Sequence, residues 1–186
     1  MRKNFGAAAI LYPMPVLIIG SYDENGTADA MNAAWGGISE EHEISICVSD
    51  THKTVANITA RGAFTVSIAD AENVVAADYV GIVSGNKVPD KVARAGWNPI
   101  KSELVDAPLF KELPLALECK LISYDKDSCR LVGEIINVCA DESILGEDGK
   151  IDLSKFRPIT YDPIHHTYRT LGDVAGHAFS DGNKLK

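Results

Sequence analysis

Two hairpin signals, far apart in the chain, constrain the fold more than any other feature of this sequence. The first is Asp-Glu-Asn-Gly at 23–26, which separates the apolar segment 16–22 from a second arm that starts at residue 27. Asn-Gly is a strong signal of a tight hairpin because both residues tolerate a positive φ. The second is the polar stretch 125–128, flanked by two long segments in which apolar residues alternate. Both signals indicate an antiparallel sheet.

The remaining pattern adds strands and a few short helices. The helix at 55–62 is expected to begin at the N-cap Thr54 and to stop at Gly62, and Asp70 is expected to cap a second helix at 71–81. A short helical turn opens at Pro89-Asp90 and ends at Gly96. The expected strands are 16–22, 27–39, 44–49, 64–69, 115–124, 129–140 and 157–161. Six or seven strands at this spacing predict a mainly β chain with an antiparallel barrel, formed by a single domain over 1–186.

Composition excludes several classes of protein. No apolar run among the 186 residues is long enough to cross a membrane, and Pro13 and Pro15 interrupt the apolar start, so a first strand is favoured over a signal peptide. We therefore expect a cytoplasmic protein. A formal charge of −8 without a basic cluster argues against nucleic-acid binding. The four cysteines form no Cys-x-x-Cys pair and the five histidines show no ligand spacing, so neither a disulfide framework nor a metal site is expected.

The second arm of the first hairpin has an unusual composition. Residues 31–37 read Met-Asn-Ala-Ala-Trp-Gly-Gly, and small side chains are poor strand formers. Such residues let a flat ligand lie against the backbone, with Asn32 as an amide and Trp35 as an apolar wall. Close packing against another strand or subunit explains the pattern equally well. For a flat ligand, Ala33→Leu or Gly36→Val is expected to block binding.

Two further segments could hold an anion. Ser-Asp-Thr-His-Lys-Thr at 49–54 precedes a helix, whose first N–H groups are unpaired and carry partial positive charge. Ser-Gly-Asn-Lys at 84–87, followed by Lys91, forms a glycine-containing loop with two cations. An ordinary helix cap and a solvated surface loop remain open for these segments when each is taken alone. No Gly-x-Ser-x-Gly, Walker or Gly-x-Gly-x-x-Gly motif is present. The sequence therefore does not indicate a serine hydrolase, a P-loop nucleotide-binding protein or a Rossmann dinucleotide-binding protein of the usual kind.

An ordered set of motifs nevertheless resembles the flavin reductase-like family, in its flavoredoxin branch, over nearly the whole chain. The matching segments are Pro13–Val16, 23–26, 31–39, 44–54, Arg61–Val66, Val83–Gly85 with Asp90-Lys91, Pro108-Leu109 before 116–121, and Tyr168–Gly172. The resemblance implies an FMN-binding split barrel, which is an antiparallel Greek-key barrel, and a homodimer with FMN near the subunit interface. The cofactor-binding positions that it implies are Asn32, Ala33, Ala34, Trp35, Ser49, Thr51, His52, Lys53, Thr54, Ser84, Gly85, Lys87 and Lys91.

The resemblance also implies an activity, because isoalloxazine accepts and passes on electrons while the protein binds and orients it. The expected function is a flavoredoxin-like oxidoreductase fed by NAD(P)H or by a ferredoxin-like redox protein. Two alternatives stay open: a reductase that releases reduced flavin to a partner monooxygenase, and a non-catalytic flavin- or haem-binding module. No catalytic side chain is identified, and the electron donor, the final acceptor and the role of the tail 173–186 are not indicated.

Overall fold

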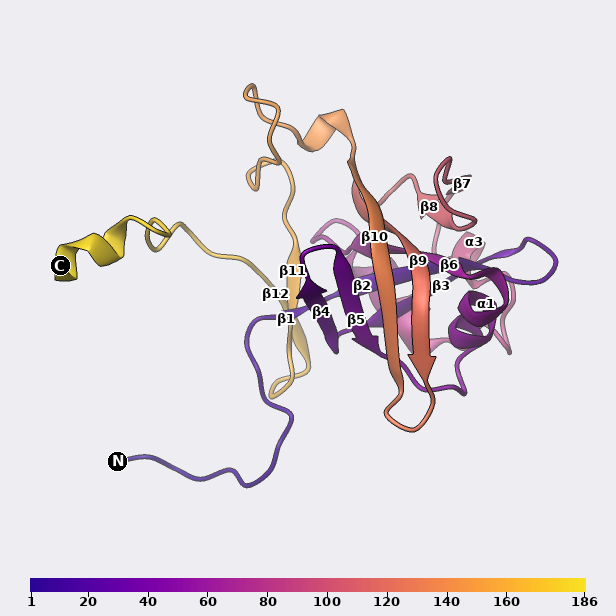
Figure 1. Cartoon of the computed structure of the whole chain (residues 1–186), viewed down its shortest axis with the longest axis horizontal. Coiled ribbons are helices and arrows are strands. Elements are labelled where there is room, and N and C mark those ends of the chain that lie inside the picture. The colour runs from indigo at the N-terminus through magenta and orange to yellow at the C-terminus, as the bar shows by residue number, and fades with distance from the viewer.

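The computed structural model describes residues 1–186 and is built around a seven-stranded antiparallel sheet (Figure 1). In spatial order the strands are β3 (Ala28–Ala33), β2 (Leu17–Tyr22), β6 (Ala63–Ile68), β9 (Leu115–Asp125), β10 (Arg130–Ala140), β5 (Glu43–Cys47) and β4 (Gly36–Glu40). The chain jumps from β5 to β6, which lies on the far side of β9 and β10. This jump gives the sheet its Greek-key order.

The sheet must curl, because β3 and β4 lie at its two opposite edges although only Ala34 and Trp35 separate them in sequence. Six strand spacings would set the edges of a flat sheet about 29 Å apart. The three Cα steps from Ala33 to Gly36 span at most about 11 Å. The edges therefore approach each other, and the sheet forms the half-closed barrel that the sequence predicts.

Apolar residues of β2 alternate between two cores. Ile19 belongs to a cluster with Phe64 and with Val55 and Ile58 of helix α1 (Lys53–Arg61). Its neighbour Ile18 belongs to a second cluster, with Val80 of α2 (Val74–Ile82), Val92 of α3 (Lys91–Arg94) and Trp97. Because successive strand residues point to opposite faces, β2 is covered on both sides, and the helices α2 and α3 lie against β3.

Smaller elements surround the barrel. A three-stranded sheet has the order β1 (Met14–Pro15), β11 (Ile159–Asp162), β12 (Thr167–Thr170), and a two-stranded sheet pairs β7 (Pro99–Lys101) with β8 (Pro108–Phe110). Short 3-10 helices cover Glu142–Ile144 and Asp181–Leu185. No helix is long and apolar enough to cross a membrane.

Both ends of the chain leave the body as extended arms, and Figure 1 shows each one projecting away from the sheet. The N-terminal arm is tied at Tyr12, whose hydroxyl donates to the Asp162 carboxylate of β11. This hydrogen bond, together with those from His165, lowers the pKa of Asp162 well below its usual range. The C-terminal arm beyond residue 170 is exposed almost throughout.

The structure corrects three details of the sequence-based expectations. The arm 27–39 is two strands, β3 and β4, rather than one. His52, not Thr54, occupies the N-cap of α1, because the buried Thr54 hydroxyl instead donates to Asp29 Oδ2 at 3.0 Å. Asp70 accepts from the Asn73 N–H and thereby closes a turn before α2, which begins only at Val74.

The two hairpin turns also differ in detail from the expected form. In the first, only Gly26 takes a positive φ, of 79°, and the Asp23 carboxylate accepts from the N–H groups of Asn25 and Thr27. In the second, Cys129 has a φ of 56° and ends the turn, so β10 begins at Arg130. Both turns nevertheless join antiparallel strands as expected.

Candidate functional site

Three hollows follow one another along β3 and the turn after it. The first, of ≈ 170 Å³, lies between Asp29, the start of α1 and residues 80–85. The second, of ≈ 340 Å³, shares Gly81 and Ile82 with the first. The third, of ≈ 420 Å³, shares Ala34 with the second and is mostly apolar. Together they form one groove beside the free edge of β3, which we call the β3 groove.

The first hollow offers unpaired hydrogen-bond donors. Lys53 and Thr54 open α1, and their backbone N–H groups have no acceptor within the chain. The same is true of the N–H groups of Ser84 and Gly85, on the loop after α2. All four residues line this hollow, together with His52. Free N–H groups at a helix start favour an anion at this end of the groove.

The two lysines of this hollow are not equivalent. Lys91 is 3% exposed, and its ammonium lies 3.3 Å from Asp29 Oδ1 and donates to the carbonyls of Val80 and Val83. The Lys91 charge is therefore compensated inside the protein by Asp29 and by the two carbonyl groups. Lys53 is partly exposed and reaches Asp23 Oδ2 at 3.0 Å. Lys53 is the cation better placed to meet a bound anion.

Glycine at position 85 is required by the close approach of the loop to β3. A Cβ at this position would lie 2.4 Å from Asp29 Oδ1, which is far inside van der Waals contact. At Gly81 a Cβ would lie 2.9 Å from the Cβ of Asn32. The absence of these side chains lets the end of α2 and the following loop form one wall of the groove.

Three of the expected anion-binding residues do not line the groove. The hydroxyls of Ser49 and Thr51 lie 3.0 Å apart and pair with each other. Between them, Asp50 forms a 2.8 Å ion pair with Lys126, which lowers the pKa of Asp50 and ties this loop to the β9–β10 turn. Lys87 is exposed on the loop after α2. The structure brings the other ten candidate residues to the groove or to the strand that borders it: Asn32, Ala33, Ala34, Trp35, His52, Lys53, Thr54, Ser84, Gly85 and Lys91.

The small residues of β3 and the following turn have different surroundings. Ala33 points into the first core, and a Cβ at Gly36 would lie 3.1 Å from side-chain atoms of Leu17 and Ile46. Ala33→Leu and Gly36→Val would therefore add bulk to the core as well as to the strand, so a loss of ligand in these variants would not by itself report on a flat ligand. Ala34 lines the second and third hollows, and Trp35 lines the third with 58% of its surface exposed.

The second hollow contains side chains that the sequence did not point to. The Tyr168 hydroxyl donates to Asp78 Oδ1 at 2.8 Å, and burial together with this carboxylate raises the pKa of Tyr168 to about 12. The Tyr161 hydroxyl lies 2.8 Å from His166 Nδ1. All four side chains line the hollow beside Asn32, whose amide donates to the Ala77 carbonyl at 2.9 Å. The sequence placed Tyr168 in the family-matching segment Tyr168–Gly172, but it gave this residue no role in binding.

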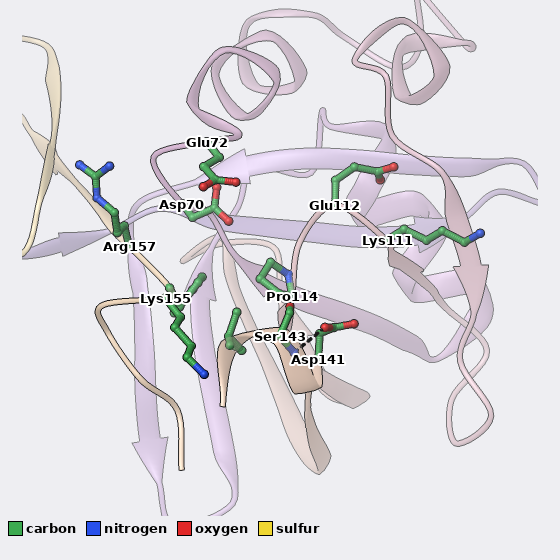
Figure 2. A pocket seen from close by; sticks show the side chains of 11 residues that line it. Asp70, Glu72, Lys111, Glu112, Pro114, Asp141, Ser143, Lys155 and Arg157 are labelled. Atoms are coloured by element: carbon green, nitrogen blue, oxygen red, sulfur yellow. Dashed lines mark hydrogen bonds between the residues drawn. The ribbon is translucent and has the colours of Figure 1, made fainter. Parts of the chain in front are cut away.

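A separate pocket of ≈ 370 Å³ lies near the start of α2, where Asp70 and Glu72 contribute to its lining. Figure 2 shows that the charged ends of Arg157, Lys155 and Lys111 point away from one another. The Glu112 carboxylate is already bonded to Asn98, and the Lys155 ammonium to the Leu145 carbonyl. These groups do not converge on one point, so the β3 groove is the better candidate site.

Comparison with known proteins identifies the family. The family model described as "Flavin reductase like domain" matches residues 9–169. The chain belongs to the flavin reductase-like family. It resembles a flavoredoxin of Desulfovibrio vulgaris (Miyazaki F), with 39% identity, a TM-score of 0.93 and coverage of 98% of this chain and 100% of that one. A flavoredoxin from Methanosarcina acetivorans is 30% identical, with a TM-score of 0.86 and coverage of 100% and 98%. These matches place the chain in the flavoredoxin branch.

More distant proteins also match the chain. An FMN-binding domain of a flavin reductase-like enzyme from Shewanella baltica OS155 is 18% identical, with a TM-score of 0.79 and coverage of 88% of each chain. An uncharacterized protein of Aeropyrum pernix is 25% identical, and the chain spans 64% of the length of that relative. The structural matches show the split-barrel architecture, and the family membership together with the flavoredoxin matches supports a flavin oxidoreductase-type function.

Proposed function

We propose that this protein binds FMN in the β3 groove and acts as a flavoredoxin-like electron-transfer oxidoreductase. The proposal rests on one observation, which is the order of the chemical groups along the β3 groove. Unpaired N–H donors and Lys53 lie at one end, a strand edge with small residues lies in the middle, and an apolar hollow with Trp35 lies at the other end. This order suits the phosphate, the ribityl chain and the flat ring of FMN.

The residues of the first hollow fit the phosphate. A dianion there would accept from the N–H groups of Lys53, Thr54, Ser84 and Gly85, and the Lys53 ammonium would offset part of its charge. Such local donors are needed because the chain has a net charge of −8, which disfavours an anion at long range. When bound, FMN would supply the capacity to accept and donate electrons.

The flat ring would lie along the edge of β3, beside Asn32, Ala34 and Trp35. Backbone N–H and C=O groups at a free strand edge can pair with the hydrogen-bonding rim of a heterocycle. Donors at this rim stabilise the negative charge that develops on reduction, since they are fixed before the charge appears. No side chain of the chain itself needs to act as an acid or a base in this step.

A homodimer with the groove near the subunit interface is part of the proposal. The terminal arms carry exposed apolar side chains, among them Phe5, Val174 and Phe179, that contact little of their own chain. The third hollow is formed partly by the N-terminal arm, residues 8–15, and it is apolar. Such exposed apolar surface favours contact with a second copy. A cytoplasmic location fits the four free thiols.

The test is an absorbance spectrum of the gel-filtered protein, followed by anaerobic addition of NADH and of NADPH. We expect flavin bands that survive gel filtration. Bleaching by one nucleotide would name the electron donor, and bands that bleach only with a reduced ferredoxin-type protein would assign a redox-protein donor. A colourless protein that does not take up added FMN would overturn the proposal. A colourless protein that reduces added FMN with NAD(P)H would replace it with the released-flavin reductase.

A further inference from the structure

Asp29 is an acidic side chain buried beside the hollow that we assign to an anion. It lies on β3 and is 3% exposed. Its Oδ2 accepts from the Thr54 hydroxyl at 3.0 Å, and its Oδ1 lies 3.3 Å from the Lys91 ammonium. Both carboxylate oxygens are thus occupied by donors of the chain. Because like charges repel, Asp29 is not a ligand for an anion, and its role follows from the two side chains that it binds.

The contact with Thr54 ties the start of α1 to β3. His52 occupies the N-cap of this helix, and its side chain makes no capping hydrogen bond. The buried Thr54 hydroxyl donates its one proton to Asp29. The first turn of α1 is therefore anchored by Asp29, while the N–H groups of Lys53 and Thr54 stay free for a ligand.

The contact with Lys91 holds the opposite wall of the first hollow. The Lys91 ammonium also donates to the carbonyls of Val80 and Val83, at the C-terminal end of α2. Carbonyl groups at this end of a helix have no acceptor role within it, so a buried cation stabilises them. The loop after α2 lies directly against Asp29, because a Cβ at Gly85 would be 2.4 Å from Asp29 Oδ1. Asp29 therefore contacts this wall both through Lys91 and through the loop itself.

The two walls belong to different parts of the fold. Val55 of α1 packs in the first core, whereas Val80 of α2 packs in the second. Asp29 lies on the edge strand β3 and is bonded to both walls, so it fixes the distance between their free N–H groups. An anion that accepts from both walls needs this distance to be constant, because hydrogen bonds weaken steeply when their geometry is lost.

We propose that Asp29 is the positioning residue of the anion site. It does not touch the anion, and it holds the start of α1 and the loop after α2 at the separation at which their N–H groups bind one phosphate. That this phosphate belongs to FMN rests on the proposed function. Lys91 compensates the Asp29 charge, which allows a carboxylate to lie beside the site without strong repulsion of the phosphate.

The experiment compares FMN with riboflavin, which has the same ring and lacks the phosphate. Thr54→Val keeps the shape and the backbone N–H of this residue and removes the hydroxyl that binds Asp29. Fluorescence quenching on the flavin-free protein measures both affinities. We expect Thr54→Val to bind FMN about tenfold more weakly and riboflavin within about twofold of the wild type. Thr54→Ser retains the hydroxyl and should keep FMN binding within about threefold of the wild type.

A second variant separates positioning from charge. Asp29→Ala removes a negative charge near the phosphate, so charge alone predicts tighter binding of FMN. Positioning predicts the opposite, a loss of at least about tenfold for FMN relative to riboflavin. When Thr54→Val is added to Asp29→Ala, FMN binding should fall by no more than about a further twofold, because the hydroxyl has already lost its partner. Tighter FMN binding in Asp29→Ala, additive losses in the double variant, or unchanged FMN binding in Thr54→Val would overturn the proposal.

Thr65→Val is the matched control. Thr65 is also buried, its hydroxyl donates to the Pro108 carbonyl, and it lines none of the three hollows. The substitution should keep the wild-type ratio of the FMN and riboflavin affinities even where it lowers stability. Circular dichroism verifies that each variant folds. A ratio that falls as far in Thr65→Val as in Thr54→Val would also contradict a specific role of Asp29.

Inorganic phosphate separates this inference from the proposed function. Its binding to the flavin-free protein is followed by the NMR signals of the N–H groups of Lys53, Thr54, Ser84 and Gly85. A wild type that binds phosphate but no flavin, with phosphate binding lost in Thr54→Val, would contradict FMN binding and leave the positioning role standing. A protein that binds FMN equally well with and without the Asp29 contacts would contradict the positioning role alone. A protein that binds neither phosphate nor FMN would contradict both.

Discussion

Lys87 and Lys91 look alike in the sequence, where each follows a glycine-containing loop and each was expected to face an anion. The structure separates them by their surroundings. Lys91 is buried against Asp29, which lies 62 positions earlier in the chain, whereas Lys87 is exposed. Only the docking of α3 on β3 brings Lys91 and Asp29 together. A contact over such a sequence separation leaves no local signal, so the sequence could place the loop but could not assign its two cations.

We predict that Lys91→Met lowers the free energy of unfolding by about 3–5 kcal/mol, because it leaves Asp29 buried without its cation. Equilibrium unfolding in urea measures this change. Lys87→Met is the matched control and should change the free energy by less than about 0.5 kcal/mol. Equal effects of the two substitutions would show that the buried pair does not stabilise the fold.

The second prediction at the residue scale concerns Lys53 and depends on the proposed function. Lys53→Gln should weaken the binding of FMN about tenfold and leave that of riboflavin within about twofold, because only FMN carries the phosphate. Fluorescence quenching of each flavin measures both affinities. Lys150→Gln, whose ammonium is exposed and pairs with Asp148, is the control. Equal losses for FMN and riboflavin would place the phosphate elsewhere.

At the scale of elements, local patterns were reliable where the structure is itself local. The two hairpins and the helix that ends at Gly62 appear close to where the sequence predicts them, because turn residues and alternation act over a few positions. The division of 27–39 into β3 and β4 and the pairing of β1 with β11 were missed. These features depend on partners far away in the chain, such as Tyr161 opposite Met14. The candidate site shows the same division: the sequence pointed to the segments that line most of the β3 groove, but it did not indicate the contribution of β11 and β12.

The contact between β12 and α2 gives a pH prediction. The pKa of Tyr168 is about 12 in the folded protein and 10.0 when unperturbed. Between these values the unfolded chain loses the proton while the folded chain keeps it, so the stabilisation is complete below pH 10 and is lost as the pH rises to 12. Unfolding in urea at pH 9 and pH 11.5 should show that the wild type loses more stability than Tyr168→Phe, by roughly 1 kcal/mol after allowance for solvent screening. Equal losses of stability in the wild type and in Tyr168→Phe would contradict the raised pKa of Tyr168.

Large apolar side chains are exposed both on the body of the molecule and on its terminal arms. Ile136 and Val138 lie close together on β10, where its pairing with β9 is irregular, and both are exposed, Val138 by 53%. The terminal arms add further apolar side chains that reach away from the body (Figure 1). A single chain leaves these groups in water, whereas a second copy could cover both the exposed residues of β10 and the arms. A stable dimer buries about 1,600 Å² in total, so the contact would have to include both the exposed residues of β10 and the arms.

We predict that the double substitution Ile136→Lys and Val138→Glu shifts the protein from the proposed dimer to a monomer, because it places charges where apolar contact is expected. Sedimentation equilibrium over a range of protein concentrations measures the state, and circular dichroism verifies that the barrel still folds. Leu104→Glu is the control, since Leu104 is also exposed but lies in the connection between β7 and β8. If the groove lies near the interface as proposed, the monomeric variant should also bind FMN more weakly than the control. A wild-type protein that sediments as a monomer would contradict the dimer, and a monomeric variant with unchanged FMN affinity would place the groove away from the interface.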